Sequence, residues 1–228
     1  LYRFGDRGGQ MVAIDFHHQG RDSTYQIGKP VQTNRATSYY QPAHPREAEP
    51  SIERFFASGV LNLQEKLGPV NWQLLPTKRF DPADFEAFLK LLPKTIEGRK
   101  ILHVVEVRHE GFRTAEFVDL LRAYKTGVVL TDKDAFPHIP DVTSPFVYIR
   151  LQRSSEGEEC GYPAAALDLW AARAFAWSRG NVPKDLEPIA GPEKKPPKSR
   201  NVFIYFINGF KPKAPAAAMA LMERLSNG

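Results

Sequence analysis

The chain alternates short, almost uninterrupted apolar runs with longer segments whose apolar residues recur at helical spacing. The apolar runs fall at 69–75, 103–109, 127–132, 146–152 and 201–207, and helical patterns fall at 81–92, 115–124, 163–180 and 214–225. Strands that are apolar throughout are typical of a parallel sheet covered by helices, because they are buried on both faces. The sequence therefore predicts an α/β fold whose five strands are parallel and adjacent in chain order.

Two architectures fit this alternation, a doubly wound sheet and a (β/α)₈ barrel. A chain of 228 residues, 42% of them hydrophobic, is long enough to bury one substantial core. The start of one helix is marked clearly, since Asp81 and Pro82 stand in the order of an N-cap and a first helical residue. Nearer the front, residues 51–67 have helical spacing, and we expect that helix to end at Gly68-Pro69.

Polar side chains gather where the expected strands end. They are Gln73, Glu106, Arg108, His109, Asp132, Asp134, Arg150, Gln152 and Asn208. Because ligands of parallel α/β sheets bind at the carboxyl ends of the strands, these residues mark the candidate site. The two-residue alternation of a strand places Glu106 and Arg108 on one face of theirs, and Arg150 and Gln152 on one face of another.

Several motifs resemble a known family in their order and spacing. They are "LGPVNWQLLP", "VVEVRHEGF", "FVYIRLQR", "GYP" before a Trp-bearing helix, and "VFIYFIN" leading into "APAAAMALMERL". These stretches resemble the successive motifs of the YecE-like family, the domain-of-unknown-function family 72 (DUF72), from about residue 50 to the end. The resemblance implies a TIM-type (β/α) barrel. It implies no reaction, since the biochemical function of the family is not established.

The resemblance does not extend to residues 1–49, which lack the family's Gly-rich first strand and its "VEIN" type strand. The stretch "MVAIDFHHQG", residues 11–20, suits a strand but matches the family pattern poorly. We therefore expect an atypical N-terminal segment over 1–49, whether native, truncated or frame-shifted. Residues 50–228 are expected to form a barrel domain that is incomplete or open on its N-terminal side. Gln152 stands where many family members have His, which weakens any mechanism that needs a His there.

The charged candidates each allow two interpretations. Glu106 and Arg108 either form an ion pair that closes the barrel end, or contact a ligand, with Arg108 binding an anion and Glu106 acting as acid or base. Arg150 needs an anionic partner, from Glu106 or from a ligand, because an unpaired buried charge is very costly. Asp132 is a candidate for catalysis or, with Asp134, for a divalent cation, yet capping and solvated-loop roles suit both.

Further candidates for ligand binding are Gln73, His109, Gln152, Tyr205 and Asn208. His109 suits loop capping or packing equally well, and Tyr205 suits the core, although its phenol can donate to a ligand. Cofactors and metals stay open, because the sequence contains no P-loop, dinucleotide fingerprint, nucleophile elbow or paired-cysteine zinc spacing.

Three classes of function remain. The first is an enzyme acting on an anionic small molecule, such as a phosphate or sugar derivative. The second is a nucleic-acid or phosphodiester-processing protein, favoured by a pI near 9.3, and the third is a non-catalytic binding protein. The net charge of +5 is largely local, since residues 184–213 hold seven Lys/Arg against three Asp/Glu. The single cysteine, Cys160, and the lack of a membrane-spanning run favour a cytoplasmic location.

Overall fold

The computed structural model describes residues 48–193, 195–207 and 209–227 and, before them, the backbone of four strands. These strands are β1 (Tyr2–Phe4), β2 (Gln10–Ile14), β3 (Ser23–Gln26) and β4 (Lys29–Gln32). β3 and β4 form an antiparallel hairpin of their own. β2 joins the main sheet, so the first part of the stretch "MVAIDFHHQG" does form a strand.

The main sheet has seven strands in the order β1-β2-β11-β10-β9-β8-β5. Its later members are β5 (Val70–Gln73), β8 (His103–Glu106), β9 (Gly127–Thr131), β10 (Phe146–Leu151) and β11 (Asn201–Phe206). Every neighbouring pair is parallel except β1 and β2. The prediction of five adjacent parallel strands in chain order is therefore confirmed. Among the described strands no ladder joins β1 to β5, so this order is linear.

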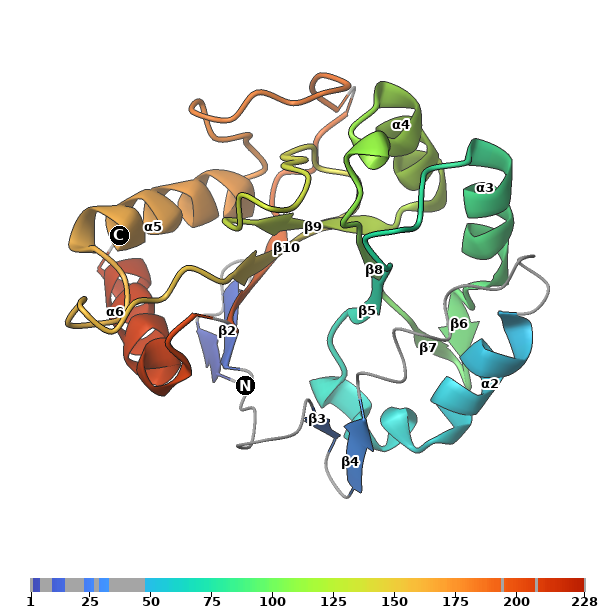
Figure 1. The fold of residues 1–228 in the computed structure, drawn as a ribbon, viewed down its shortest axis with the longest axis horizontal. Helices are drawn as coiled ribbons and strands as arrows, with labels where there is room; N and C mark the ends of the chain where they lie inside the picture. Colours follow the sequence, from blue (N-terminus) through green and yellow to red (C-terminus); the bar gives the residue numbers. More distant parts are fainter. Residues whose placement is uncertain are drawn as a thin grey trace.

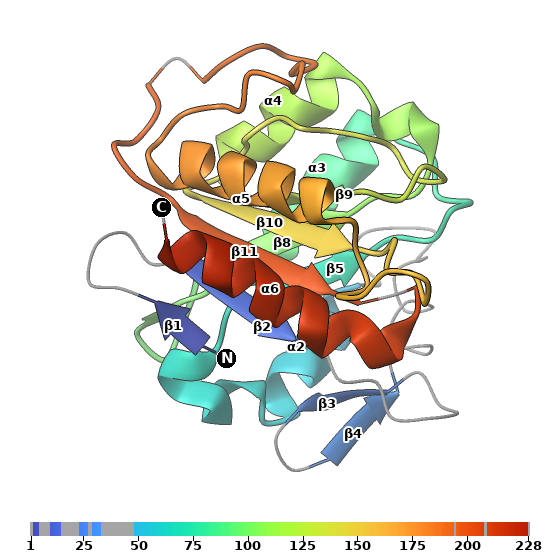
Figure 2. The ribbon, with the colours of Figure 1, turned by 90° about the vertical axis from the view of Figure 1, so that its left-hand side faces the viewer.

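Helices cover the outer side of this sheet. They are α2 (Glu49–Ala57), α3 (Pro82–Leu91), α4 (Ala115–Tyr124), α5 (Ala164–Ser178) and α6 (Ala214–Ser226). In Figure 1 the strands from β2 to β5 follow an arc, and α3, α4, α5 and α6 lie outside it. Figure 2 shows α5 and α6 side by side in front of β10, β11 and β2. The short strands β6 (Thr95–Ile96) and β7 (Arg99–Lys100) form a separate hairpin.

Local signals set the start of α3 and the end of α2. The side chain of Asp81 accepts the backbone N–H of Asp84 at 2.9 Å, which confirms the predicted N-cap. The single helix expected over 51–67 is wrong, because α2 ends at Ala57 and a 3₁₀ segment, η3 (Val60–Lys66), follows. Gly59, the second of the two residues between them, has φ 94°, a left-handed conformation that ends an α-helix.

The core lies on both faces of the sheet. Toward the helices, large side chains fill two clusters that include Trp72, Phe85, Phe112, Phe117, Leu130, Ile149, Trp170 and Trp177. Trp170 and Trp177, both on α5, pack in the second of these clusters. On the inner face a smaller cluster contains Val104, Val129, Phe146, Tyr148 and Phe203. The inner face is therefore apolar toward the amino ends of its strands.

His103 at the start of β8 is buried and hydrogen-bonded at both ring nitrogens. Its Nδ1 accepts from Trp72 Nε1 at 3.0 Å, and its Nε2 lies 2.8 Å from the carbonyl oxygen of Pro93. The ring is therefore neutral, with its proton on Nε2. Burial lowers the pKa of His103, and the hydrogen bond to Pro93 opposes that shift only in part.

Asp141 joins two loops that lie far apart in the sequence. Its side chain has 0% exposure and accepts the backbone N–H groups of Ile189 at 2.7 Å and Ala190 at 2.9 Å. Arg122 lies 3.6 Å from the same carboxylate and also 3.6 Å from the carboxylate of Asp119, which is 70% exposed. Asp141 thus anchors the segment after α5 to the loop before β10.

Two glycines differ in what surrounds them. Gly180 and Gly191 both have left-handed backbone conformations, with φ values of 78° and 75°. A Cβ atom on Gly180 would overlap the carbonyl oxygen of Pro197, whereas a Cβ on Gly191 would meet nothing within 4 Å. The segment before β11 therefore lies directly against the end of α5 at Gly180.

Candidate functional site

Strand alternation brings polar side chains to the carboxyl end of the inner face. Glu106 is two residues beyond Val104, and Arg150 is two residues beyond Tyr148, so both continue the inner face of their strands. Gln73 pairs in register with Glu106 across β5 and β8. Because the strands are parallel and adjacent, these side chains meet at one edge of the sheet, as the sequence predicted.

Glu106 lies at the centre of this cluster, with 2% of its side chain exposed. Its Oε1 accepts from Arg108 Nε at 3.1 Å and Nη2 at 3.0 Å, and its Oε2 forms an ion pair with Arg150 Nη1. A weaker bond of 3.4 Å joins Asn71 Nδ2 to Oε2. Both carboxylate oxygens of Glu106 are therefore engaged by positive or polar donors.

Gln73 ties the two arginines together. Its Oε1 accepts from Arg108 Nη2 at 2.6 Å and from Arg150 Nη1 at 3.3 Å. The guanidinium of Arg108 is also covered on one face by the ring of Phe136, at 4.7 Å from the ring centroid. Neighbouring groups thus hold Arg108 in one orientation.

The charges of the cluster do not cancel. Two guanidiniums surround one carboxylate, which leaves a formal charge of +1. Burial by itself would raise the pKa of Glu106, but the attraction of Arg150 and Arg108 and their hydrogen bonds outweigh it and lower the pKa. Glu106 is therefore an ionised counter-ion at neutral pH.

The arginines keep part of their surface accessible. The side chains of Arg108 and Arg150 are 22% and 15% exposed. Within the described part of the chain, no acceptor bonds Arg108 Nη1, while its Nε and Nη2 are both in use. The Nε2 of Gln73 likewise has no acceptor among these residues. The arrangement offers hydrogen-bond donors to an oxyanion that approaches the strand ends.

Asp132 makes its hydrogen bonds outside this cluster. Its Oδ1 accepts from Gln152 N at 2.7 Å, and its Oδ2 accepts from Tyr162 Oη at 2.8 Å. Burial raises the pKa of Asp132 despite the opposing hydrogen bonds. β9 ends at Thr131, one residue short of the predicted strand end, and Asp134 is 84% exposed beside Arg153. The structure therefore brings neither aspartate to Glu106.

The other predicted site residues lie in different surroundings. Gln152 is buried, and its Nε2 donates to Thr131 Oγ1 at 3.1 Å. His109 accepts the N–H of Gly111 at 2.9 Å and caps the 3₁₀ segment η4 (Glu110–Phe112). Tyr205 pairs in register with Arg150 and stacks on Tyr148 with ring centroids 4.7 Å apart. Asn208 lies outside the described residues.

Three residues of the cluster were missed by sequence reasoning. Asn71 shares a strand face with Gln73, and Tyr148 shares one with Arg150, so the two-residue alternation could have identified both. Phe136 lies in a loop, where no periodicity indicates which way its ring points.

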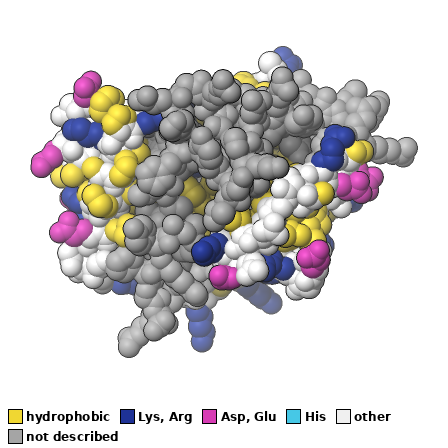
Figure 3. Space-filling model, turned by 90° about the horizontal axis from the view of Figure 1, so that it is seen from below, with side chains coloured by type: hydrophobic (Ala, Val, Ile, Leu, Met, Phe, Trp, Pro, Cys, Tyr) yellow, Lys and Arg dark blue, Asp and Glu magenta, His cyan; other side chains and the backbone are white. Residues whose placement is uncertain are grey.

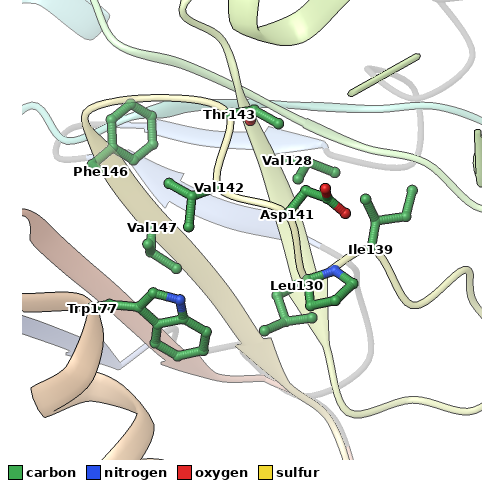
Figure 4. Close-up of a pocket in the computed structure, with 10 residues that line it drawn as sticks. Val128, Leu130, Ile139, Asp141, Val142, Thr143, Phe146, Val147 and Trp177 are labelled. Atoms are coloured by element: carbon green, nitrogen blue, oxygen red, sulfur yellow. The ribbon is translucent and has the colours of Figure 1, made fainter. Parts of the chain in front are cut away.

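A small pocket lies elsewhere, between the outer side of β9 and β10 and α5. Figure 4 shows Leu130, Val142, Val147 and Trp177 around it. Its free volume is about 10 Å³, which is roughly the space of one water molecule. The indole N–H of Trp177 is buried there and has no partner among the described residues. This pocket is too small for an organic ligand.

Two further properties limit the kinds of site that the described residues support. They contain no group of three or more His, Cys, Asp or Glu side chains placed to hold a metal ion. No described helix combines the length and the hydropathy that crossing a membrane requires. Among the coloured, described side chains in Figure 3, basic and acidic groups are interspersed.

Comparison with solved structures agrees with this fold. A DUF72 family protein from Thermotoga maritima is 18% identical with a TM-score of 0.58, over 78% of this chain and 65% of that one. A DUF72 family protein from Enterococcus faecalis is 17% identical with a TM-score of 0.56, over 83% of this chain and 71% of that one. The chain therefore spans slightly less than two thirds of the length of the Thermotoga protein.

Comparison with sequence families gives the same result. Among curated proteins none matches the chain. The family model described as "Protein of unknown function DUF72" matches residues 32–228, which begins before the expected start near residue 50. This match covers most of the sequence, and the chain therefore belongs to the DUF72 family.

Proposed function

We propose that Gln73, Glu106, Arg108 and Arg150 form a binding site for a small oxyanion, such as the phosphate group of a larger ligand. The observation that carries this proposal is the pair of partly exposed guanidiniums around one buried carboxylate. The excess of one positive charge favours an anion, and Arg108 Nη1, which no acceptor among the described residues engages, gives it a donor. Tyr205, in register with Arg150, is the proposed contact for the organic part of the ligand.

The geometry supports binding better than proton abstraction by Glu106. A general base needs a free lone pair directed at the substrate proton, and both oxygens of Glu106 accept from the cluster. We therefore assign Glu106 the role of orienting the two arginines in the free protein. We propose that Asp132, another catalytic candidate, instead holds the segment from Gln152 to Tyr162 in place.

We also propose that the domain is a TIM-type barrel, open on its N-terminal side, in the part that the structure describes. The chain-order sheet, its arc and the outer helices support this, as do the DUF72 neighbours. In this proposal β2 is a barrel strand, so the domain takes one strand from residues 1–49. Such a barrel binds ligands at the carboxyl ends of its strands, where the cluster lies.

Calorimetric titration with inorganic phosphate tests the proposed site. Arg150→Ala removes one guanidinium and brings the formal charge of the cluster to zero. It is expected to weaken phosphate binding by about 1.5–3 kcal/mol, the value of a hydrogen bond to a charged group. Arg153→Ala is the matched control, because Arg153 is 59% exposed and pairs with the exposed Asp134. If both variants bind phosphate as the wild type does, the cluster is architectural and the proposal fails.

A further inference from the structure

We infer that the cluster takes up a proton on Glu106 when an oxyanion binds. This inference rests on the proposed function and concerns how the same site is regulated. It makes anion binding dependent on pH. It also changes the role of Glu106, from counter-ion in the free protein to neutral carboxylic acid in the complex.

The first reason is competition for the same donors. Arg108 and Arg150 donate to Glu106 in the free protein, through Oε1 and Oε2 respectively. An oxyanion that contacts both guanidiniums shares the positive charge that now stabilises the Glu106 carboxylate. Because only 2% of that side chain is exposed, water cannot replace the lost stabilisation.

The second reason is the charge of the complex. The free cluster carries +1, so sulfate, which is doubly charged, brings the total to −1. Two neighbouring anionic groups at a partly buried site disfavour the ionised form of the group that can accept a proton. One proton on Glu106 restores neutrality and relieves the repulsion between the two anions.

The surrounding groups leave Glu106 as the acceptor. Among the described residues, the groups that face it are Arg108 from its own segment, Arg150 and Tyr148 from β10, and the neutral Asn71 and Gln73 from β5. Guanidiniums are already protonated at neutral pH, and burial keeps Tyr148 neutral by raising its pKa well above 10. Glu106 is therefore the one carboxylate within this set.

Sulfate is the appropriate probe, because it does not itself titrate between pH 5.5 and 8. Titration of the wild type by calorimetry in two buffers with different ionisation heats gives the protons taken up per sulfate. We expect net uptake near pH 6. We also expect sulfate affinity to rise as the pH falls from 8 to 5.5, by at most about tenfold per unit for one linked proton.

Glu106→Gln identifies the group that carries the proton. Glutamine keeps the shape of the side chain but cannot titrate, so proton uptake should disappear. The variant should also bind sulfate about tenfold more tightly at pH 8, since the competing carboxylate charge is gone. The Arg153→Ala protein serves again as control and should take up protons like the wild type.

The outcomes separate this inference from the proposed function. If the wild type does not bind sulfate, the proposed function itself fails. A different result overturns only the proton inference: the wild type binds sulfate and Arg150→Ala weakens that binding, but the heat of binding is the same in both buffers and the affinity does not depend on pH. Uptake that persists in Glu106→Gln also overturns it, because another group then carries the proton. Should that variant fail to fold, the wild-type buffer and pH series decides alone.

Discussion

Asp141 offers a direct test of how burial determines the contribution of a carboxylate to stability. Asp141 and Asp119 both lie 3.6 Å from Arg122, but their side chains are 0% and 70% exposed. Only Asp141 also accepts two backbone N–H groups, from Ile189 and Ala190. The two aspartates therefore share the same arginine partner and the same distance to it, and they differ in burial and in hydrogen bonding.

The expected magnitudes follow from these contacts. A hydrogen bond to a charged group contributes about 1.5 kcal/mol or more, so Asp141→Ala should lower the free energy of unfolding by about 3 kcal/mol or more. Removing one partner of a buried pair also leaves Arg122 uncompensated, which adds to the loss. Asp119→Ala should cost about 0.5 kcal/mol or less, as exposed ion pairs do.

Urea denaturation followed by tryptophan fluorescence measures both variants. Equal slopes of free energy against urea would show that the two unfolding transitions are comparable. Asp141→Asn adds a second comparison, because its amide nitrogen cannot accept from a backbone N–H and part of the loss should remain. A loss below about 1 kcal/mol for Asp141→Ala, or equal losses for both alanine variants, would refute this reasoning.

Three further predictions concern other parts of the fold. Burial lowers the pKa of His103, so the folded state binds fewer protons at this side chain than the unfolded state does. The contribution of neutral His103 to the free energy of unfolding is therefore full above the unfolded pKa of about 6.5 and decreases as the pH drops below it. The urea concentration at the unfolding midpoint should therefore decrease more between pH 7.5 and pH 5.5 in the wild type than in His103→Gln. An equal decrease in both proteins would contradict this. Phe117→Ala should cost about 3–5 kcal/mol by leaving a cavity at a fully buried position, whereas Met219→Ala, 62% exposed, should cost less than about 1. Comparable losses in thermal melts would count against the assigned core. Gly180→Ala should lower the melting temperature more than Gly191→Ala, because only the Cβ at position 180 overlaps a neighbouring carbonyl oxygen. Gly191→Ala should cost only about 1–2 kcal/mol, the strain of an alanine in a left-handed conformation. The reverse order of melting temperatures would be inconsistent with the contact at Gly180.

Much of the fold could be predicted because the signals are local or general. Five apolar runs gave five strands, and the handedness of crossovers gave their order. Strand ends were less predictable: β8 stops at Glu106, although the apolar pattern continues to Val107. A strand ends where its ladder of backbone hydrogen bonds ends, and side-chain pattern does not report this. Gly59 was likewise a turn signal that helical spacing around it concealed.

The candidate site was predictable to the extent that strand geometry determines it. Alternation and register placed Glu106 and Arg150 together, and the structure pairs them. Asp132 could not be assigned in the same way, because its partner Tyr162 comes from a segment without periodicity. Whether the carboxylate of Asp132 points toward Glu106 or toward Tyr162 depends on tertiary contacts, which the residues next to Asp132 in the sequence do not determine.

The pairing of β2 with β11 has a consequence for how the chain folds. Gln10 lies opposite Val202, some 190 residues away, whereas the other parallel ladders join strands that lie much nearer to each other in the chain. Contacts between residues that are far apart in the sequence form late in folding, because the chain must first lose the entropy of the long loop between them. Until β2 docks, β11 presents an unpaired edge to other chains. Recovery of native protein during refolding should therefore decline as protein concentration rises, through association at that edge.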